Sequence, residues 1–372
     1  MQEKAKVYFT DLKAWPGLNL LQKLEKLIKK AGIENIDFNN KFVAIKIHFG
    51  EPGNLSYLRP NYAKVVADVV KQLGGKPFLT DCNTLYVGRR KNAVDHLEAA
   101  YENGYSPFST GCQVIIADGL KGTDEKEIEV DGEHVKKAKI GRAIVDADII
   151  ISLNHFKGHE LTGFGGAIKN LGMGCGSRAG KKEMHSAGKP SVSQSKCVGC
   201  KMCSKQCAHE AISFDENKKA HINHDKCVGC GRCIGVCNFD AISAPNDEAN
   251  DILNKKMVEY TMAVVKDKPN FHVNFIMDVS PNCDCHGEND RPIVPSIGIV
   301  ASFDPVAIDK ASADLVNQEK AFSNSLVGEN LKDAEDLKDH FHNAHPDTNW
   351  EVMIEHGKKM GLGTDEYELI KI

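Results

Sequence analysis

Eight of the thirteen cysteines in this 372-residue sequence lie close together and share one spacing pattern. They form two groups thirty residues apart, Cys197-x2-Cys200-x2-Cys203-x3-Cys207 and Cys227-x2-Cys230-x2-Cys233-x3-Cys237. Neighbouring residues repeat as well, since Lys-Cys-Val-Gly-Cys begins both groups, and this indicates an internal duplication. Cysteines separated by two residues can wrap a loop around a metal cluster, so binding of iron and sulfur is the chemistry expected first.

The duplicated stretch, residues 196–243, resembles the bacterial ferredoxin that carries two [4Fe-4S] clusters. In that family, three cysteines of one repeat and the last cysteine of the other repeat bind each cluster. The resemblance implies one cluster on Cys197, Cys200, Cys203 and Cys237, and a second cluster on Cys227, Cys230, Cys233 and Cys207. Ala208 and Asn238 stand where the family usually has proline, which bears on loop geometry and redox potential. Zinc is the alternative metal, although zinc motifs rarely repeat this spacing twice.

A second set of reactive side chains lies outside these groups. His155, Lys157 and His159 occur within five residues, and Lys169 follows in a glycine-rich stretch. The two histidines could bind a metal, one of them could act as a general acid or base, or both could be ordinary loop residues. We predict that His155, Lys157, His159 and Lys169 bind and protonate a substrate.

The glycine-rich stretch itself has two interpretations. Six of the fourteen residues from 163 to 176 are glycine, but neither a P-loop nor a Rossmann fingerprint is present. The backbone could approach an anionic ligand, with Lys157, Lys169 and Arg178 as counter-charges. Alternatively, the stretch could be a tight turn that packs against a sheet.

The motif Cys283-x-Cys285-His286 places two thiols and an imidazole within four residues. Such soft ligands suit a transition metal, so we predict a third metal site at Cys283, Cys285 and His286. Two alternatives remain open for this motif. The thiols could be reduced and inert, or they could form a redox-active pair.

The elements that must position these residues alternate between strand and helix. Residues 62–73 have apolar side chains at the helical period, and Gly74 and Gly75 end that pattern. We expect strands at 42–47, 76–80, 113–117, 148–153, 273–279 and 297–301, helices at 62–73, 93–103, 251–265 and 305–316, and a hairpin at 127–138. This alternation predicts an α/β fold, with a largely parallel sheet and helices on both faces. The ferredoxin resemblance implies a small inserted α+β ferredoxin-type domain in addition.

Polar segments follow five of the expected strands, at residues 48–51, 81–84, 154–159, 280–286 and 302–305. Ligands of such folds bind beyond the carboxyl ends of the strands, so we expect these segments to form one shared pocket. Asp304, just before Pro305, is also expected to cap the following helix. The ferredoxin-like insert would occupy residues 189–246, and residues 1–188 and 247–372 would form one discontinuous α/β domain.

The α/β domain resembles a known family, the domain of unknown function 362 (DUF362). The resemblance rests on residues 46–51, 154–159, 162–174, 283–286 and 302–309 and spans nearly the whole domain. Members with a central ferredoxin insert share this layout. The resemblance implies no particular reaction, so the function must be argued from the site.

Composition excludes several classes of protein. The formal net charge is −4, from 47 Lys plus Arg and 51 Asp plus Glu, so neither nucleic acid nor a membrane surface is expected as a partner. Residues 1–20 lack the apolar core of a signal peptide, and no stretch approaches the roughly 18 uncharged apolar residues of a membrane span. We therefore expect a cytoplasmic protein whose cysteines serve metal binding or redox chemistry.

Three functions fit this sequence. The first is a ferredoxin-linked oxidoreductase, in which two [4Fe-4S] clusters pass electrons to a small-molecule substrate in the α/β domain. The second is a non-catalytic electron carrier or adaptor that docks a redox partner protein. The third is a metal or cofactor maturation factor that would use Cys283 and Cys285 to hold a metal transiently.

Overall fold

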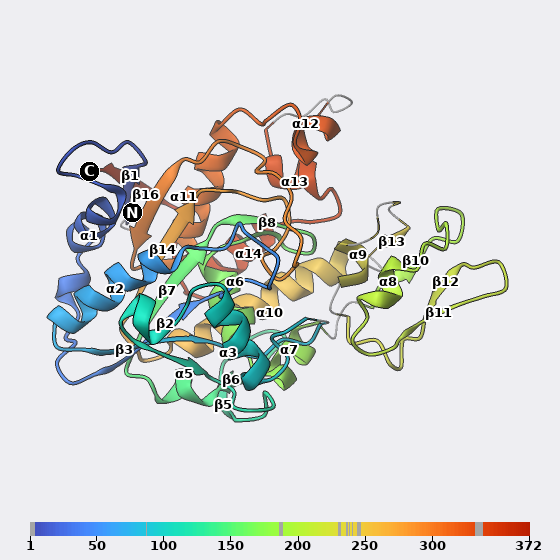
Figure 1. The fold of residues 1–372 in the computed structure, drawn as a ribbon, viewed down its shortest axis with the longest axis horizontal. Helices are drawn as coiled ribbons and strands as arrows, with labels where there is room; N and C mark the ends of the chain where they lie inside the picture. The colour runs from blue at the N-terminus through green and yellow to red at the C-terminus, as the bar shows by residue number, and fades with distance from the viewer. Residues whose placement is uncertain are drawn as a thin grey trace.

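The computed structural model describes residues 4–86, 88–185, 189–229, 232–235, 237, 239, 241–243, 247–331 and 338–372. Its centre is an eight-stranded sheet with the strand order β16-β1-β15-β14-β7-β2-β3-β4 (Figure 1). The strands are β1 (Ala5–Asp11), β2 (Phe42–Ile47), β3 (Lys76–Asp81), β4 (Gln113–Ile116), β7 (Ile149–His155), β14 (Asn270–Ile276), β15 (Gly298–Ser302) and β16 (Tyr367–Lys371). Both chain ends lie at the β16–β1 edge of this sheet (Figure 1).

Seven of these eight strands run in one direction. Strands β14, β7, β2, β3 and β4 pair in parallel, and β1 pairs in parallel with β16. Only β15 is reversed, because it pairs antiparallel with both β1 and β14. The segment at residues 302–305 therefore lies at the amino-terminal ends of the other strands, opposite the other four polar segments. The prediction that it shares their pocket is wrong. The expected helix cap there is confirmed, since the Asp304 carboxylate accepts hydrogen bonds from the amides of Val306 and Ala307 at 2.9 and 2.8 Å.

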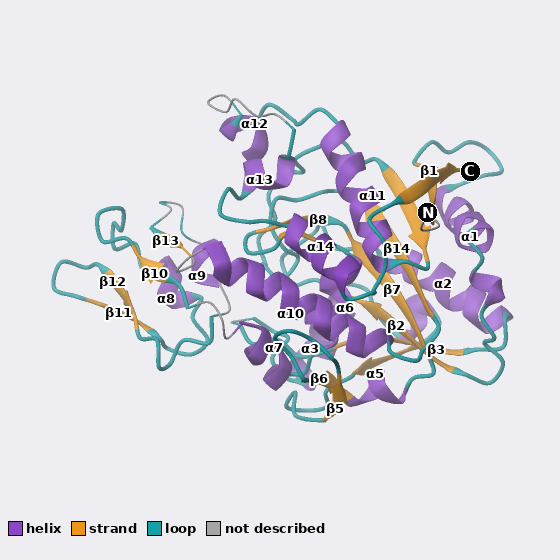
Figure 2. Cartoon of the chain, turned by 180° about the vertical axis from the view of Figure 1, so that it is seen from behind, coloured by secondary structure: helices purple, strands orange, loops and turns teal. Residues whose placement is uncertain are grey.

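Helices cover both faces of the sheet, as the alternating pattern predicts. One face packs against α1 (Leu20–Lys30), α2 (Pro60–Gln72) and α3 (Ala93–Glu102). The other face packs against α6 (Ala167–Cys175), α10 (Asp247–Val265), α11 (Pro305–Gln318) and α14 (Glu351–Lys359), which Figure 2 shows in front of the strands. Strand β2 illustrates the cause, because Val43 and Ile45 face the first core while Ala44 faces the second. The α/β fold class is thereby shown.

Shorter elements complete this part of the chain, called the α/β unit below (residues 4–185 and 247–372). The expected hairpin is present as β5 (Glu125–Glu129) and β6 (Lys137–Gly141), which pair antiparallel. A second small hairpin consists of β8 (Lys157–His159) and β9 (Gly163–Gly165). The remaining elements are η1 (Ile33–Asn35), α4 (Pro107–Thr110), α5 (Arg142–Asp146), α7 (Arg178–His185), α12 (Leu326–Asn330) and α13 (His340–Ala344).

Residues 189–243, called the cysteine-rich segment below, lie beyond the amino-terminal end of α10 (Figures 1 and 2). Their elements are β10 (Ser191–Val192), α8 (Met202–Lys205), β11 (Ile212–Phe214), β12 (Ala220–Ile222), α9 (Arg232–Gly235) and β13 (Ile242–Ser243). Strands β10 and β13 pair antiparallel, as do β11 and β12, so none of these strands joins the central sheet. Within the described part of the chain, none of the helices is both long and apolar enough to cross a bilayer.

Candidate functional site

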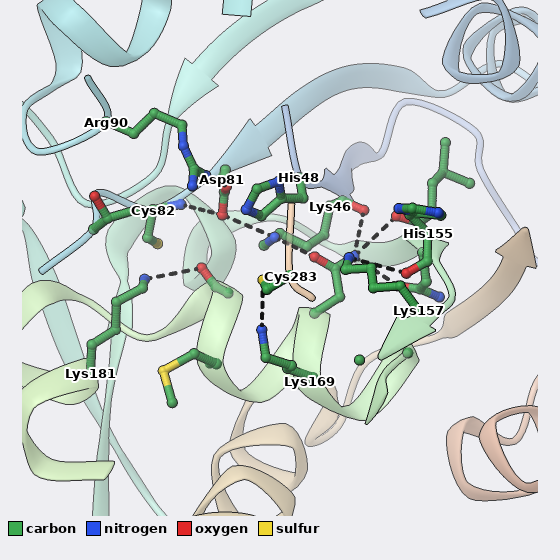
Figure 3. A pocket seen from close by; sticks show the side chains of 18 of the residues that line it. Lys46, His48, Asp81, Cys82, Arg90, His155, Lys157, Lys169, Lys181 and Cys283 are labelled. Atoms are coloured by element: carbon green, nitrogen blue, oxygen red, sulfur yellow. Dashed lines mark hydrogen bonds and ion pairs between the residues drawn. The ribbon is translucent and has the colours of Figure 1, made fainter. Parts of the chain in front are cut away.

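Four of the five polar segments meet at the carboxyl ends of the parallel strands. They line a cavity of about 530 Å³, including its open mouth, which we call the lysine cavity because four lysines line it (Figure 3). The residues that matter most for its chemistry are Lys46, His48, Asp81, Arg90, Lys157, Lys169, Lys181 and Cys283. The fold thus brings the predicted residues Lys157, Lys169 and Cys283 together in the lysine cavity, at the carboxyl ends of the strands.

A neighbouring cavity shares Tyr86, Lys169, Met173 and Lys181 with the lysine cavity. We call it the histidine cavity, since His159 and His185 line it together with Leu85, Glu160 and Cys285. The two cavities therefore meet around the Lys169 side chain. Cys283 faces the lysine cavity and Cys285 faces the histidine cavity.

Charges at the base of the lysine cavity are compensated by buried ion pairs. The fully buried Lys46 ammonium lies 3.0 Å from an Asp81 oxygen and donates a 2.6 Å hydrogen bond to Asn170. Burial opposes ionisation of Asp81, but Lys46 and the neighbouring cations outweigh it and lower the pKa of Asp81. Arg90 in turn donates a 2.8 Å bond to Glu51. The base is therefore a rigid, charged platform.

His48 offers the cavity a polar group that no protein atom among the described residues satisfies. Its Nδ1 accepts a hydrogen bond from the Gly50 amide at 3.1 Å, which places the ring proton on Nε2. That buried Nε2 has no partner among those residues. Burial and the Arg90 charge hold the pKa of His48 well below its usual range, so the ring is neutral. His48 can therefore donate one hydrogen bond to a bound molecule.

His155 and Lys157 both contact the Asp284 carboxylate. The His155 Nδ1 lies 2.9 Å from the Asp284 carboxylate, and its Nε2 lies 2.9 Å from the carbonyl oxygen of Met277. Lys157 Nζ lies 3.0 Å from Asp284. Burial raises the pKa of Asp284, but His155 and Lys157 outweigh it, so the pKa is lowered overall. Because both ring nitrogens of His155 face acceptors, this histidine is placed to hold Asp284 and its loop.

His159 and Lys169 converge instead on the Cys283 sulfur. Lys169 Nζ lies 3.3 Å from Cys283 Sγ, and Cys285 and His159 lie beside that sulfur. The hydrogen bond from Cys285, together with the Lys169 charge and the neighbouring His159, lowers the pKa of Cys283 well below its usual value despite its burial. These neighbours favour the thiolate form of Cys283. The thiolate raises the pKa of Lys169 in return, against the effect of burial.

Beside this thiolate, Glu160, Cys285 and His286 form a buried cluster whose ligand atoms lie within 4.8 Å of one another. His286 Nε2 lies 2.9 Å from a Glu160 oxygen. Burial raises the pKa of Glu160, but the neighbouring His159 and His286 outweigh this and hold it well below its usual range. A metal placed here would use Glu160 with Cys285 and His286, while the predicted third ligand, Cys283, points toward Lys169. Sequence reasoning missed Glu160 because no cysteine or histidine spacing includes it.

The glycine-rich stretch packs closely against its neighbours, as the second interpretation states. A Cβ atom on Gly172 would lie 2.2 Å from the Met257 carbonyl oxygen of α10, and one on Gly174 would lie 2.5 Å from Lys46 Nζ. The first amides of α6, those of Ala167 and Ile168, donate to the Asp309 carboxylate at 2.7 and 2.9 Å. The amino-terminal end of α6 is therefore already occupied by the Asp309 carboxylate. Arg178, the third expected counter-charge, does not line the lysine cavity.

The first predicted set of cluster ligands lies together in the cysteine-rich segment. Cys197, Cys200, Cys203 and Cys237 line one small cavity. Backbone amides donate to the sulfurs, from Ala220 to Cys197 at 3.4 Å and from Ala241 to Cys237 at 3.3 Å. Amide donors of this kind stabilise thiolates and tune iron–sulfur clusters. The residues present therefore fit a [4Fe-4S] cluster.

The second ligand set is partly described. The amides of Ala211 and Gly229 donate to Cys207 at 3.3 Å and to Cys227 at 3.4 Å, which mirrors the first set. The thiols of Cys207 and Cys227 interact electrostatically, so they lie near each other. Cys233 lies in α9, and Cys230 lies outside the described residues.

This second set lies on the side of the segment that touches the histidine cavity. His185, which lines that cavity, lies beside the backbone of Gly229, between Cys227 and Cys230. His209, two residues after Cys207, lies beside the backbone of Leu85, another lining residue. Burial lowers the pKa of His185 to about 3, so it contributes a neutral ring to this contact.

The fold and the site together define an α/β protein whose lysine cavity lies at the carboxyl ends of the parallel strands. Its cysteine-rich segment contacts the adjacent histidine cavity. A family model described as a domain of unknown function (DUF362) matches residues 43–314. Since this match covers more than half of the chain, the protein belongs to the DUF362 family. Membership leaves the reaction to be argued from the site.

Three further proteins are similar to parts or all of this chain. A thylakoid-associated protein of Synechocystis sp. is 28% identical over 124 residues, which are 33% of this chain and 35% of the relative, so the match spans about a third of the relative. The lactate racemase apoprotein from Thermoanaerobacterium thermosaccharolyticum matches with a TM-score of 0.44 and 9% identity, over all of this chain and 84% of that one. A Thermotoga maritima protein matches with a TM-score of 0.41 and 13% identity, over 80% of this chain and 58% of that one.

Proposed function

We propose that this protein is an iron–sulfur oxidoreductase that passes electrons from two [4Fe-4S] clusters to a small molecule in the lysine cavity. In this proposal residues 189–246 form an inserted ferredoxin-like domain, and residues 1–188 with 247–372 form the α/β domain. When bound, the clusters would supply single electrons. The observation that carries the proposal is the contact of the Cys207 and Cys227 loops with the wall of the histidine cavity.

The eight cysteines divide between the two clusters as the ferredoxin resemblance implies. Cys197, Cys200, Cys203 and Cys237 would bind one cluster, and their shared cavity with its amide–sulfur hydrogen bonds supports this set. Cys207, Cys227, Cys230 and Cys233 would bind the other. Zinc is less well supported, because tetrahedral zinc binds four thiolates without needing two interleaved sets.

In the α/β domain, four residues would serve the bound molecule in different ways. Lys157 and Lys169 would provide positive charge at the cavity, and His159 would carry a proton on Nε2 toward the Cys283 sulfur. His155 would position Asp284 and Lys157, because both of its ring nitrogens are already engaged. The His48 Nε2, which has no partner in the described part of the chain, would donate a hydrogen bond to the molecule.

The test of this proposal starts from anaerobically purified protein. We expect about eight irons and eight acid-labile sulfides per chain, and an EPR signal of reduced [4Fe-4S] clusters after reduction. Cys203→Ser and Cys233→Ser should each lower the iron content and weaken that signal without unfolding the α/β domain. Stoichiometric zinc without sulfide would contradict the proposal.

The buried Glu160–Cys285–His286 cluster favours a second candidate, a metal or cofactor maturation factor. Such a protein would hold a zinc or nickel ion there between transfer steps. One metal ion per chain beyond the cluster iron, lost on Cys285→Ser but retained on Cys112→Ser, would support it. A docked redox partner protein is the third alternative, and recovery of a stoichiometric oxidoreductase with this chain would favour a carrier role.

A further inference from the structure

We propose that Cys283 and Cys285 form a redox-active dithiol, in which Cys283 attacks a small anionic disulfide in the lysine cavity and Cys285 then closes an internal disulfide. This inference deepens the proposed function and rests on it only for the source of the electrons that reopen the internal disulfide. The exchange reaction itself needs nothing beyond residues of the α/β unit.

The two sulfurs occupy the wall between the two cavities. Cys283 is 2% exposed and lines the lysine cavity, whereas Cys285 is 6% exposed and lines the histidine cavity. Cys285 hydrogen-bonds to the Cys283 sulfur, so the two sulfurs are neighbours. The intervening turn is tight, because the His286 amide donates to the Cys283 carbonyl at 3.1 Å. A disulfide between them would therefore need little movement of the backbone.

Cys283 is the attacking sulfur because a cation and a hydrogen-bond donor lie beside it. The Lys169 ammonium lies 3.3 Å away. His159 accepts the amides of Leu161 and Thr162 on Nδ1, at 3.1 and 3.3 Å, which leaves its protonated Nε2 for the sulfur. A thiolate with a nearby cation and a proton donor is the arrangement that thiol–disulfide exchange requires.

The lysine cavity favours a substrate that carries carboxylates. His48 Nε2 is a buried donor with no hydrogen-bond partner among the described residues, and Arg90 Nη1 has only the Asp81 carboxylate, at 3.5 Å. Lys181 donates to the backbone carbonyls of Gly174 and Gly176, so its ammonium adds positive charge to the cavity. An anionic group would satisfy these donors, whereas a neutral or cationic group would leave them unpaired.

The proposed reaction balances. The Cys283 thiolate attacks one sulfur of the substrate disulfide, forms a mixed disulfide and releases the first product thiolate, which takes the proton of the Cys285 thiol. The Cys285 thiolate then attacks Cys283, which breaks the mixed disulfide and releases the second product thiolate, and this thiolate takes a proton from solvent. The substrate has gained two electrons and two protons, and the dithiol has become a disulfide. Reopening that disulfide takes two electrons and two protons, and two one-electron iron–sulfur clusters are the class of reductant that the proposed function provides.

The experiment uses the full-length protein, reduced with dithiothreitol, desalted without oxygen, and then mixed with a defined disulfide. Cystine carries two carboxylates, and 2-hydroxyethyl disulfide is its uncharged match. We expect cystine to produce a Cys283–Cys285 disulfide, identified by peptide mass after alkylation, about tenfold faster than the uncharged disulfide does. In Cys285→Ser the reaction should stop at a mixed disulfide that carries one cysteine on Cys283.

Two lysine variants separate activation from substrate selection. Lys169→Met should slow the reaction with both disulfides, because it removes the cation beside the sulfur. Lys181→Met should slow the reaction with cystine more than with the uncharged disulfide. Thermal unfolding shows whether each variant remains folded. A folded protein with no Cys283–Cys285 disulfide after cystine, or with a bound metal that protects Cys285, overturns the inference.

Failure of the proposed function would look different. In protein with reduced clusters, cystine should remove the EPR signal, and Cys283→Ser should preserve it. If cystine produces the Cys283–Cys285 disulfide but leaves the EPR signal of the wild-type protein unchanged, the dithiol stands and the electron route from the clusters falls.

Discussion

The α/β unit buries two continuous hydrophobic cores, one on each face of its sheet, whereas the described part of the cysteine-rich segment has a hydrophobic cluster of five buried residues. Two of those five are Cys197 and Cys203, which are predicted cluster ligands. Segments of about 50 residues seldom bury enough apolar surface to fold alone and usually need disulfides or metals. The comparison teaches that the α/β unit is stabilised by its core, and we expect the segment to depend on a metal cluster bound by its cysteines.

Polar groups show the same contrast. In the α/β unit, buried carboxylates such as Glu259 and Asp309 hold distant elements together through several backbone amides. In the cysteine-rich segment, backbone amides point instead at cysteine sulfurs, as Ala211 does at Cys207 and Ala241 does at Cys237. Each region therefore uses its buried backbone donors for a different class of acceptor.

The largest expected effect follows from removing the clusters. Chelation of iron, or the double variant Cys203→Ser/Cys237→Ser, should unfold the cysteine-rich segment, because structural metal sites contribute on the order of 10 kcal/mol to small domains. Limited proteolysis should then cut within residues 189–243, while the thermal transition of the α/β unit persists. A segment that resists proteolysis without iron would show that its small hydrophobic core is sufficient.

The next effect should be confined to the α/β unit. The fully buried Glu259 on α10 accepts the amides of Glu133 and Val135 at 2.8 and 2.6 Å and lies 3.0 Å from His356 Nε2 on α14. Glu259→Gln places an amide group against these donors and should cost about 2–4 kcal/mol in urea unfolding. The iron content should not change.

The matched control is in the same loop. Glu133 pairs with Lys359 on the surface, so Glu133→Gln should change the free energy of unfolding by less than about 1 kcal/mol. Equal losses from Glu259→Gln and Glu133→Gln would mean that the buried network does not hold α10 to this loop.

Much of this architecture could be predicted from the sequence, and the failures share one cause. The apolar run of β2 and the helical period of α2 are local signals, and both elements form as expected. The reversed direction of β15 is not a local property, because it is decided by pairing with β1, whose residues lie nearly 300 positions away in sequence. Strands β1 and β16 were not predicted, and β16 has only a half-buried pattern with little periodicity.

The same division holds for the candidate site. The convergence of polar segments at four strand ends follows from parallel strands, so Lys157, Lys169 and Cys283 could be placed at one cavity. The contacts that surround this cavity could not be predicted. Arg90 reaches Glu51, and the amide of Ala167 reaches Asp309, only through tertiary packing. One missed signal was present: Lys46 lies between Ile45 and Ile47 in an apolar strand, which is typical of a buried ion pair.

A smaller effect should appear in the pH dependence of the α/β unit. His272 is fully buried in β14, hydrogen-bonded to Ser152 and Asn270 at 2.9 and 2.8 Å, and burial lowers its pKa to about 3. Below about pH 6.5 the unfolded chain binds a proton that the folded chain excludes, so stability falls as the pH falls from 6.5 toward 3. Between pH 7 and pH 5, His272 should account for roughly 2 kcal/mol of that loss.

Urea unfolding of His272→Gln at the two pH values checks this contribution. The variant should be less sensitive to acid than the wild-type protein, although it is less stable at pH 7. An unchanged difference between pH 7 and pH 5 would assign the acid sensitivity to other buried histidines, of which His96, with a pKa of about 3, is one.

The smallest expected effect lies at the contact between the two regions. His209 of the cysteine-rich segment lies beside the backbone of Leu85, and this partly buried contact resembles a weak interface between domains. His209→Ala should cost about 1 kcal/mol, which corresponds to roughly fivefold faster proteolysis of the holo segment with no change in the unfolding of the α/β unit. His221→Ala is the control, because His221 pairs with Asp215 within the segment at 3.1 Å. If both variants are cut at the wild-type rate, the His209 contact does not order the cysteine-rich segment. If only His209→Ala is cut faster, the contact beside the histidine cavity helps to order the segment.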